Sequence, residues 1–239
     1  LTLLPFVHII AKSFSAEWAV LANKVIFLPK GFQIDTYRYA LMQPEFMNSF
    51  LISVITTAIG TLISMALTTI AAYPLSRRHL RGRKILIQIF VFTMLFNGGL
   101  IPNFILVKSL GLLNNPAVII IVQMFDIFNL LVIKSFFEGI PESIEEAARI
   151  DGASHYYVYL KIVIPMSLPV IATVSLYYAV NYWINFFTPM MYITKPSAKP
   201  MQLLIYELIT QSKNASEITD LTQYEITADS IRAASVVIS

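Results

Sequence analysis

The first candidates for chemistry in this chain are polar side chains placed inside otherwise apolar segments. Asp126 lies inside the apolar run 109–133, and Asn129 follows at the spacing of one helical turn. A carboxylate inside a membrane span is costly and marks a substrate or ion pathway by default. The alternative is a structural Asp that bonds to a neighbouring helix or stays protonated. The pair therefore predicts either a polar pathway or a polar contact between helices.

A second candidate is the aromatic stretch from Tyr177 to Phe187. Four of its residues are spaced to share one helix face: Tyr178, Tyr182, Asn185 and Phe186. Aromatic rings with polar groups suit sugars, because the rings pack on C–H faces while the polar atoms bond to hydroxyls. Aromatic residues that face lipid or form an interfacial belt explain the same pattern. The stretch predicts one or the other.

The segment 139–165 carries a third pattern, typical of a helix, a glycine turn and a second helix. Pro141 suits the first position of a helix, and glutamates follow it in the first turns, where they favour the positive end of the helix dipole. Gly152 can adopt the left-handed conformation that ends a helix. Ser154 can cap a second short helix, which Pro165 limits. A linker that merely joins two spans is the alternative interpretation.

This segment resembles the EAA loop of ABC-importer permeases. Glu146-Ala147-Ala148 and Asp151-Gly152-Ala153 are followed by Ile162 and Pro165 at the offsets of that motif. The resemblance implies that the loop docks on a separate ATPase subunit and couples ATP hydrolysis to transport. The residues to which it gives this role are Glu146, Ala147, Ala148, Arg149, Asp151, Gly152, Ile162 and Pro165.

The wider chain resembles the carbohydrate-uptake branch of these permeases, and within it the second permease of lipo-oligosaccharide and aldouronate-type systems. The segments that carry this likeness are Phe96–Pro102, Lys108–Leu112, Phe136-Phe137 and Ile140-Pro141. It implies a type I ABC importer permease fold and an oligosaccharide substrate, with acidic sugars suggested. It also implies a second permease subunit, two copies of an ATPase that bind ATP and Mg²⁺, and an extracytoplasmic solute-binding protein.

Composition indicates the elements that must hold these residues. Of the 239 residues, 56% are hydrophobic and only 13% charged, and mean hydropathy is +0.68. A helix needs about 20 mostly apolar residues to cross a bilayer. Four runs meet that length with at most one charge: 46–76, 85–107, 109–133 and 162–194. Shorter apolar runs at 1–11 and 233–239 predict two further, truncated spans, and Gly98-Gly99 predicts a break in the third helix. We therefore expect an all-α integral membrane protein with about six transmembrane helices, forming a single transmembrane domain over residues 1–239.

Basic residues give the orientation. Five of them crowd the link between the second and third spans: Arg77, Arg78, Arg81, Arg83 and Lys84. Short cytoplasmic loops retain such residues, so this link and segment 139–165 are expected in the cytoplasm. The predicted location is the bacterial cytoplasmic membrane, with multiple passes and contact with lipid.

Several function classes are excluded or disfavoured. The chain has no cysteine, its three histidines are scattered, and it lacks a phosphate-binding loop. We expect no catalysis, no metal site, no cofactor bound by this chain and no nucleic-acid partner. Two alternatives remain: an ion-coupled secondary transporter that uses Asp126, and an ABC permease for a non-sugar solute such as an amino acid or a peptide.

Overall fold

The computed structural model describes residues 4–16, 19, 22, 24–32, 44–96 and 98–218. This part of the chain is helical and contains no strand, which confirms the all-α class. The helices are α1 (Leu4–Ser13), α4 (Pro44–Ser76), α5 (Arg83–Leu95), α6 (Leu100–Ser109), α7 (Ala117–Gln123), α8 (Ile127–Glu138), α9 (Glu142–Ile150), α10 (His155–Val158), the π-helix η1 (Tyr159–Val163), α11 (Ile164–Met166), α12 (Leu168–Ile184), α13 (Phe187–Tyr192), the 3₁₀ turn η2 (Pro196–Ala198) and α14 (Met201–Ile218).

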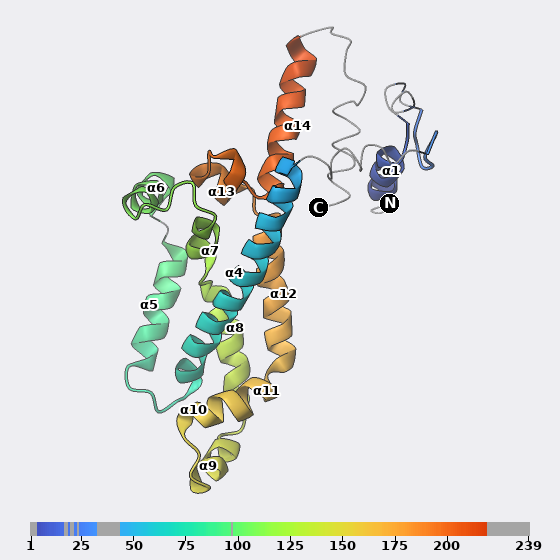
Figure 1. Cartoon of the computed structure of the whole chain (residues 1–239). Helices are drawn as coiled ribbons and strands as arrows, with labels where there is room; N and C mark the ends of the chain where they lie inside the picture. Colours follow the sequence, from blue (N-terminus) through green and yellow to red (C-terminus); the bar gives the residue numbers. More distant parts are fainter. Residues whose placement is uncertain are drawn as a thin grey trace. The chain divides into compact units, whose positions relative to one another are not determined.

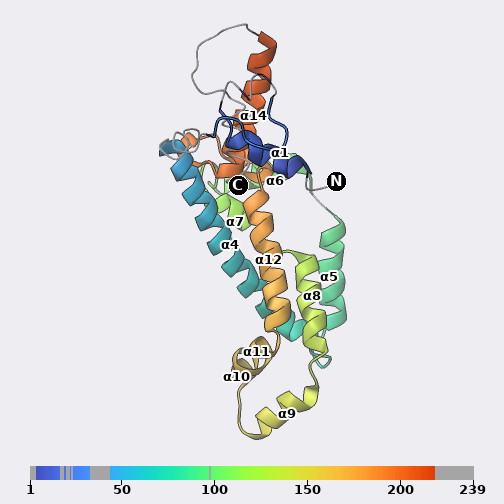
Figure 2. The same cartoon turned by 90° about the vertical axis from the view of Figure 1, so that its right-hand side faces the viewer.

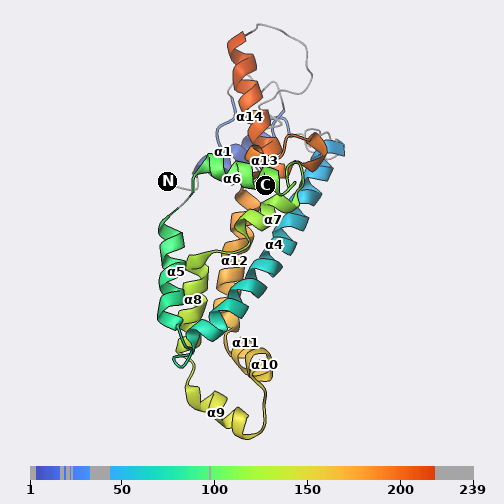
Figure 3. The same ribbon diagram turned by 90° about the vertical axis from the view of Figure 1, so that its left-hand side faces the viewer.

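The chain divides into two compact units, residues 55–184 and the remainder. In the 55–184 unit, α4, α5, α8 and α12 run alongside one another (Figures 1 and 2), and α8 packs against both α5 and α12. The link between α4 and α5 lies at the same end of this unit as α9 and α10 (Figure 3). The two segments predicted to be cytoplasmic therefore share one end.

The packing of α4 is the reverse of that in a soluble helix. Ser64 and Thr68 are fully buried, whereas Leu62 and Ile70 are well exposed. Lipid solvates apolar side chains, so small polar residues at the interface let helices approach and hydrogen-bond to one another. This distribution indicates that the exposed apolar side chains face hydrocarbon.

The predicted spans are present, but most are bent. In the described part of the chain, α4 is the one unbroken helix that is long and apolar enough to cross a membrane. Three bent pairs meet the same criteria: α5 with α6, α7 with α8, and His155–Met166 with α12. Together these elements correspond to the four long apolar runs. At the N-terminal end α1 is too short to cross, and the predicted span at 233–239 lies outside the described residues.

The third span breaks where its glycines predict. Helix α5 ends at Leu95 and α6 begins at Leu100, with Gly99 between them at φ +88°. Glycine adopts this conformation without the steric cost that a Cβ imposes. The predicted break at Gly98-Gly99 is confirmed.

The fourth span differs from its prediction. A continuous helix was expected to carry Asp126 deep in an apolar run, but α7 ends at Gln123 and α8 begins at Ile127, at an angle of 56°. Asp126 is the N-cap of α8, and its Oδ1 accepts a hydrogen bond from the backbone N–H of Asn129 at 2.8 Å. A carboxylate satisfies helix N–H groups well, and this local bond ends one helix and starts the next.

The unit outside residues 55–184 contains a small apolar contact between the start of α4 and α14. Phe46, Met201 and Ile205 are buried together. The Met201 N–H donates to Ser53 Oγ at 2.8 Å, and Asn48 Nδ2 donates to the Ser197 carbonyl at 2.9 Å. These bonds fix the turn before α14.

The orientation can be tested by thiol labelling, because the chain has no cysteine of its own. Arg81 and Tyr156 are exposed at the end of the 55–184 unit predicted to be cytoplasmic. We expect an impermeant maleimide to label Arg81→Cys and Tyr156→Cys only after the cells are opened. Ser197→Cys, in a segment predicted to be outside, is the matched control and should be labelled in intact cells. Labelling of both inner cysteines in intact cells would reverse the orientation.

Candidate functional site

The segment 139–165 forms the predicted helix, glycine turn and helix. Helix α9 begins after Pro141, which occupies the N-cap rather than the expected first helical position. At the other end, the Gly152 N–H donates to the Arg149 carbonyl and the Ala153 N–H to the Ala148 carbonyl, at 3.0 and 2.9 Å. Gly152 has φ +85°, the left-handed conformation that this kind of helix end requires.

The second half of the loop is more irregular than predicted. Ser154 caps α10 as expected, and its Oγ accepts a hydrogen bond from the Tyr157 N–H at 3.2 Å. Helix α10 then widens into the π-helix Tyr159–Val163, which contains Ile162, and Pro165 lies in the short helix α11 that follows. Proline has no N–H to donate to the preceding turn, so regular α-helical bonding is interrupted there.

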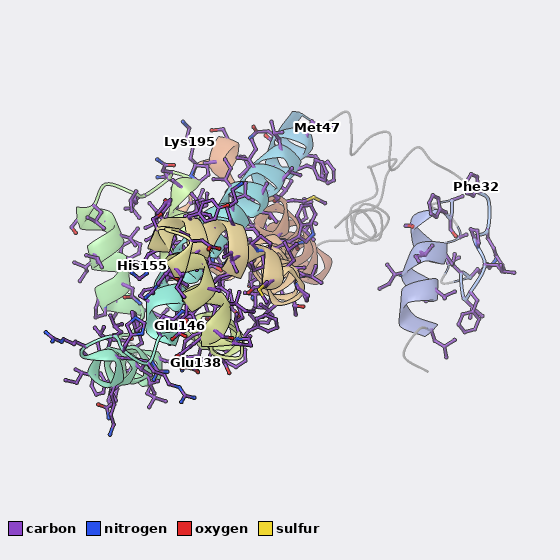
Figure 4. All side chains as sticks on the ribbon, turned by 90° about the horizontal axis from the view of Figure 1, so that it is seen from below. Phe32, Met47, Glu138, Glu146, His155 and Lys195 are labelled. Carbon is purple, nitrogen blue, oxygen red and sulfur yellow. The ribbon has the colours of Figure 1, made fainter. Side chains whose placement is uncertain are left out.

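One face of α9 is exposed in the described part of the chain. Glu146, Ala147 and Arg149 are exposed, and Ile150 is 86% exposed at the end of the helix. The end-on view in Figure 4 shows the side chains of Glu146 and His155 at this end of the 55–184 unit. Arg149 Nη2 donates to His155 Nδ1 at 3.0 Å and so links α9 to α10 across the glycine turn.

The inner side of the turn is an open groove of about 650 Å³. Its lining includes many of the predicted coupling residues, and the full set is Ala148, Asp151, Gly152, Ala153, Ser154, Tyr157, Lys161 and Ile162. The structure thus places seven of the eight predicted residues on the exposed face of α9 or in the groove beside it. Ile162 belongs to the groove through the π-helix, and Pro165 lies one turn beyond it.

Sequence reasoning missed the contact that holds α9 in place. Glu145, on the inner face of α9, is 4% exposed and forms an ion pair with Arg77, which is 5% exposed and directly follows α4. The sequence explains Arg77 as a member of the basic cluster that gives the orientation. A signal existed, because Arg77 ends the long uncharged run of α4 and Glu145 lies on the opposite face of α9 from Ala147.

A cavity of about 290 Å³ lies at the break between α7 and α8. Its lining combines polar and aromatic side chains from this break and from α12: Val122, Gln123, Phe125, Asp126, Asn129, Tyr177, Tyr178, Asn181 and Tyr182. Asp126, Asn129, Tyr178 and Tyr182 were predicted, and the structure brings all four together. Gln123, Tyr177 and Asn181 were not assigned to the site.

Asn185 and Phe186 lie beyond the end of the helix that carries Tyr178 and Tyr182, which corrects the prediction of one continuous helix face. Helix α12 ends at Ile184. Asn185 Oδ1 accepts a hydrogen bond from the Thr188 N–H at 3.0 Å, and Phe186 stacks on Tyr206 with ring centroids 4.8 Å apart. An asparagine that bonds to a backbone N–H three residues ahead competes with the continuing helix and ends it.

The tyrosines of the cavity serve the packing of α12. The Tyr178 hydroxyl hydrogen-bonds with Thr68 Oγ1 and the Tyr182 hydroxyl with Ser64 Oγ, each at 2.9 Å. The same two hydroxyls contact the broken span, where Tyr178 accepts from the Asp126 N–H at 3.2 Å and Tyr182 donates to the Ile120 carbonyl at 3.4 Å. Both rings are buried, so their hydroxyls are committed to neighbouring helices.

Other groups of the cavity are available to a ligand. Tyr177 is 52% exposed, and Asn129 Nδ2 is buried without a hydrogen-bond partner among the described residues. Native structures rarely leave a buried donor unpaired, and an unpaired one needs an explanation such as a water or a ligand. A hydroxyl-rich molecule would supply the missing acceptor. None of the residues that line the cavity is Lys or Arg.

The amino-acid sequence is similar to those of known transport proteins. The family described as "Binding-protein-dependent transport system inner membrane component" matches residues 50–238. The chain is 46% identical over 209 residues to the polygalacturonan/rhamnogalacturonan transport system permease protein YtcP of Bacillus subtilis (strain 168), covering 87% of this chain and 73% of that protein. It is 39% identical over 241 residues to protein LplC of the same organism, covering 100% and 81%.

The fold has a close counterpart among solved structures. A chain in the crystal structure of a bacterial ABC transporter involved in the import of the acidic polysaccharide alginate is similar with a TM-score of 0.90. The sequence identity is 30%, and the match covers 100% of this chain and 85% of the other. The likeness extends beyond the 55–184 unit to the whole chain length.

Proposed function

This chain belongs to the family of binding-protein-dependent transport system inner membrane components, and from that premise we propose that it carries oligosaccharides, acidic ones included, through the membrane. It is a permease subunit of an ABC importer and not an enzyme. The proposal places residues 1–239 in one transmembrane domain of the bacterial cytoplasmic membrane. A second permease, two ATPase subunits that bind ATP and Mg²⁺, and an extracytoplasmic solute-binding protein complete the importer.

The observation that carries the coupling part of this proposal is the exposed face of α9. Glu146, Ala147, Arg149 and Ile150 form a docking face at the end of the 55–184 unit, and the Gly152 turn sets the angle to α10. We assign this face to the ATPase subunit. Small alanines allow close approach, while the large exposed Ile150 is the kind of apolar anchor that protein interfaces bury.

The ion-coupled alternative has little support. Asp126 uses a carboxylate oxygen to cap α8, a structural role that a helix start explains in full. An ATP-driven importer also accounts for the loop, whereas an ion-coupled carrier has no use for it. Reconstitution with the partner subunits separates the two. We expect oligogalacturonide uptake into proteoliposomes to require ATP inside and to survive ionophores that collapse ion gradients. Uptake that ionophores abolish would overturn the proposal.

The sugar part of the proposal rests on the cavity at the α7–α8 break. Tyr177 contributes an exposed ring, and Gln123, Asn129 and Asn181 contribute amide groups to the lining. The amides of Gln123 and Asn181 also donate to the carbonyls of Ile119 and Tyr177, at 3.4 and 3.0 Å. Because no cation lines the cavity, we propose that it contacts the neutral faces of the sugar and that any carboxylate is bound elsewhere in the importer.

Tyr177→Ala tests this cavity. The ring is half exposed, so we expect the complex to assemble normally while the KM for oligosaccharide rises by roughly 2–10-fold, the equivalent of one aromatic contact. Leu176→Ala is the matched control, because Leu176 is the preceding residue, is 66% exposed and does not line the cavity. A KM that is equal in the two variants would remove Tyr177 from the substrate pathway. Tyr182→Ala is a poorer test, because it also removes the bond to Ser64.

A further inference from the structure

A buried ion pair joins α9 to the ends of two membrane helices. Arg77 Nη2 pairs with Glu145 Oε1, and Arg77 Nη1 donates to the carbonyl of Phe137 at 3.3 Å, near the end of α8. The guanidinium also lies over the Tyr73 ring, 4.9 Å from its centroid. One side chain at the end of α4 therefore contacts α4, α8 and α9.

Arg77 differs from the basic residues around it. Arg78 and Arg81 are exposed, as loop charges that set membrane orientation normally are. Burying a charge is unfavourable unless it is paired and hydrogen-bonded, so Arg77 and Glu145 depend on each other. A role in setting the membrane orientation requires neither that Arg77 be buried nor that it pair with Glu145.

The chain segments on either side of α9 are not helical, so they do not connect α9 rigidly to its neighbouring helices. Before α9, residues 139–141 form a short non-helical connection to α8, and after it the chain turns at Gly152. A helix held only by these two joints would pivot when pushed. The Arg149–His155 bond joins α9 only to α10. The Arg77–Glu145 ion pair attaches α9 through side chains to the end of the long helix α4.

A second arginine binds the same helix ends together. Arg83 Nε donates to the Leu75 carbonyl at 2.7 Å, and Arg83 also forms an ion pair with Glu138. Lys134 Nζ donates to Glu138 at 2.9 Å. These contacts link the ends of α4, α5 and α8 to one another. The Arg77–Glu145 pair therefore connects α9 to all three helices.

We propose that Arg77 and Glu145 are positioning residues that transmit movement of α9 to the membrane helices. This inference rests on the proposed docking of α9 on an ATPase subunit and adds the route by which the movement reaches the spans. Glu145 does not touch the docking face. It keeps α9 and the ends of α4 and α8 moving as one body during closure of the ATPases.

The test is the ratio of substrate-stimulated to unstimulated ATP hydrolysis in the complete reconstituted importer. Glu145→Gln keeps the shape of the side chain but leaves the Arg77 charge unpaired. We expect the ATPase subunits to copurify with this variant while the ratio falls by about tenfold or more, because a buried charge without its partner displaces its neighbours. Glu142→Gln, on the exposed side of the same helix, should keep the wild-type ratio.

Two further variants separate positioning from plain folding. Arg77→Lys keeps the charge for Glu145 and should retain most of the stimulation, and the exchange Arg77→Glu with Glu145→Arg should recover a substantial part of it. A wild-type ratio in Glu145→Gln would overturn the inference, as would loss of stimulation in Arg77→Lys equal to that in Glu145→Gln. If Gly152→Val also leaves coupling intact, the docking role of the loop itself is wrong. If Glu145→Gln leaves coupling intact while Gly152→Val does not, the docking role of the loop stands and the ion pair does not transmit the movement.

Discussion

Replacing Gly152 with valine should leave the membrane helices inserted but uncouple the importer. Gly152 has φ +85°, and a residue with a Cβ pays roughly 1–2 kcal/mol to adopt the left-handed conformation, with a β-branched residue worst placed. Apart from its two chain neighbours, no described residue has an atom within 4 Å of the position that a Cβ would take at Gly152. The expected effect therefore comes from the backbone conformation and not from a clash with those residues. A changed turn would alter the angle between α9 and α10.

The measurements are ATPase copurification and substrate-stimulated ATP hydrolysis, and we expect both to fall in Gly152→Val. Two controls isolate the cause. Gly152→Asn should be tolerated better, since asparagine enters the left-handed region more readily than valine. Gly82→Val imposes the same backbone strain at φ +78° with equally open surroundings, but in the link between α4 and α5. If Gly82→Val uncouples transport as strongly as Gly152→Val, the effect is general strain and the specific role of the 139–165 loop is refuted.

Replacing Gly60 with alanine should destabilise the 55–184 unit. A Cβ at Gly60 would lie 2.8 Å from the Tyr182 ring, closer than real contacts allow. The ring is buried and its hydroxyl is bonded to Ser64, so it cannot move away without breaking that bond. Overpacking of this kind costs about 1–3 kcal/mol.

Thermal unfolding of the purified complex should therefore shift downward by several degrees, about 2–4 °C for each kcal/mol in a chain of this size. Gly98→Ala is the control, because the nearest atom to its Cβ would be 4.0 Å away. Tyr182→Phe keeps the ring and removes the hydroxyl, so combining it with Gly60→Ala should lower the cost by freeing the ring. An unchanged melting temperature in Gly60→Ala would mean that α4 and α12 are not held at this distance.

The sequence predicted best what is determined locally. The Gly152 turn and the Ser154 cap follow from the conformational preferences of single residues, and both are confirmed. The same kind of signal was present at Asp126 and Asn185, each followed three residues later by the N–H that it accepts. At both places the length of the apolar run favours one continuous span, and that expectation is wrong. Bilayer length constrains how far the chain must reach and does not require the helix to be unbroken.

The pairing of Arg77 with Glu145 could not be predicted in the same way. The two residues are far apart in the sequence, and each had a sufficient local explanation, as a cytoplasmic arginine and as a first-turn glutamate. Which charges are buried together depends on how α4, α8 and α9 pack, and no residue type determines that. The cavity lining could not be predicted for the same reason. Tyr177 and Asn181 line the cavity only because α12 packs beside the broken span.

The hydroxyl contacts between α4 and α12 have a consequence for the energy barrier between transport states. Tyr178 and Tyr182 each touch one side-chain oxygen of α4 and one backbone group of the α7–α8 region. A hydroxyl rotates freely and can both donate and accept, so each can keep at least one of its two partners through a small rotation of α12. Polar atoms then stay bonded throughout the motion, whereas interlocked aliphatic side chains would first have to separate. We therefore expect this interface to resist sliding less than one built of interlocked aliphatic side chains.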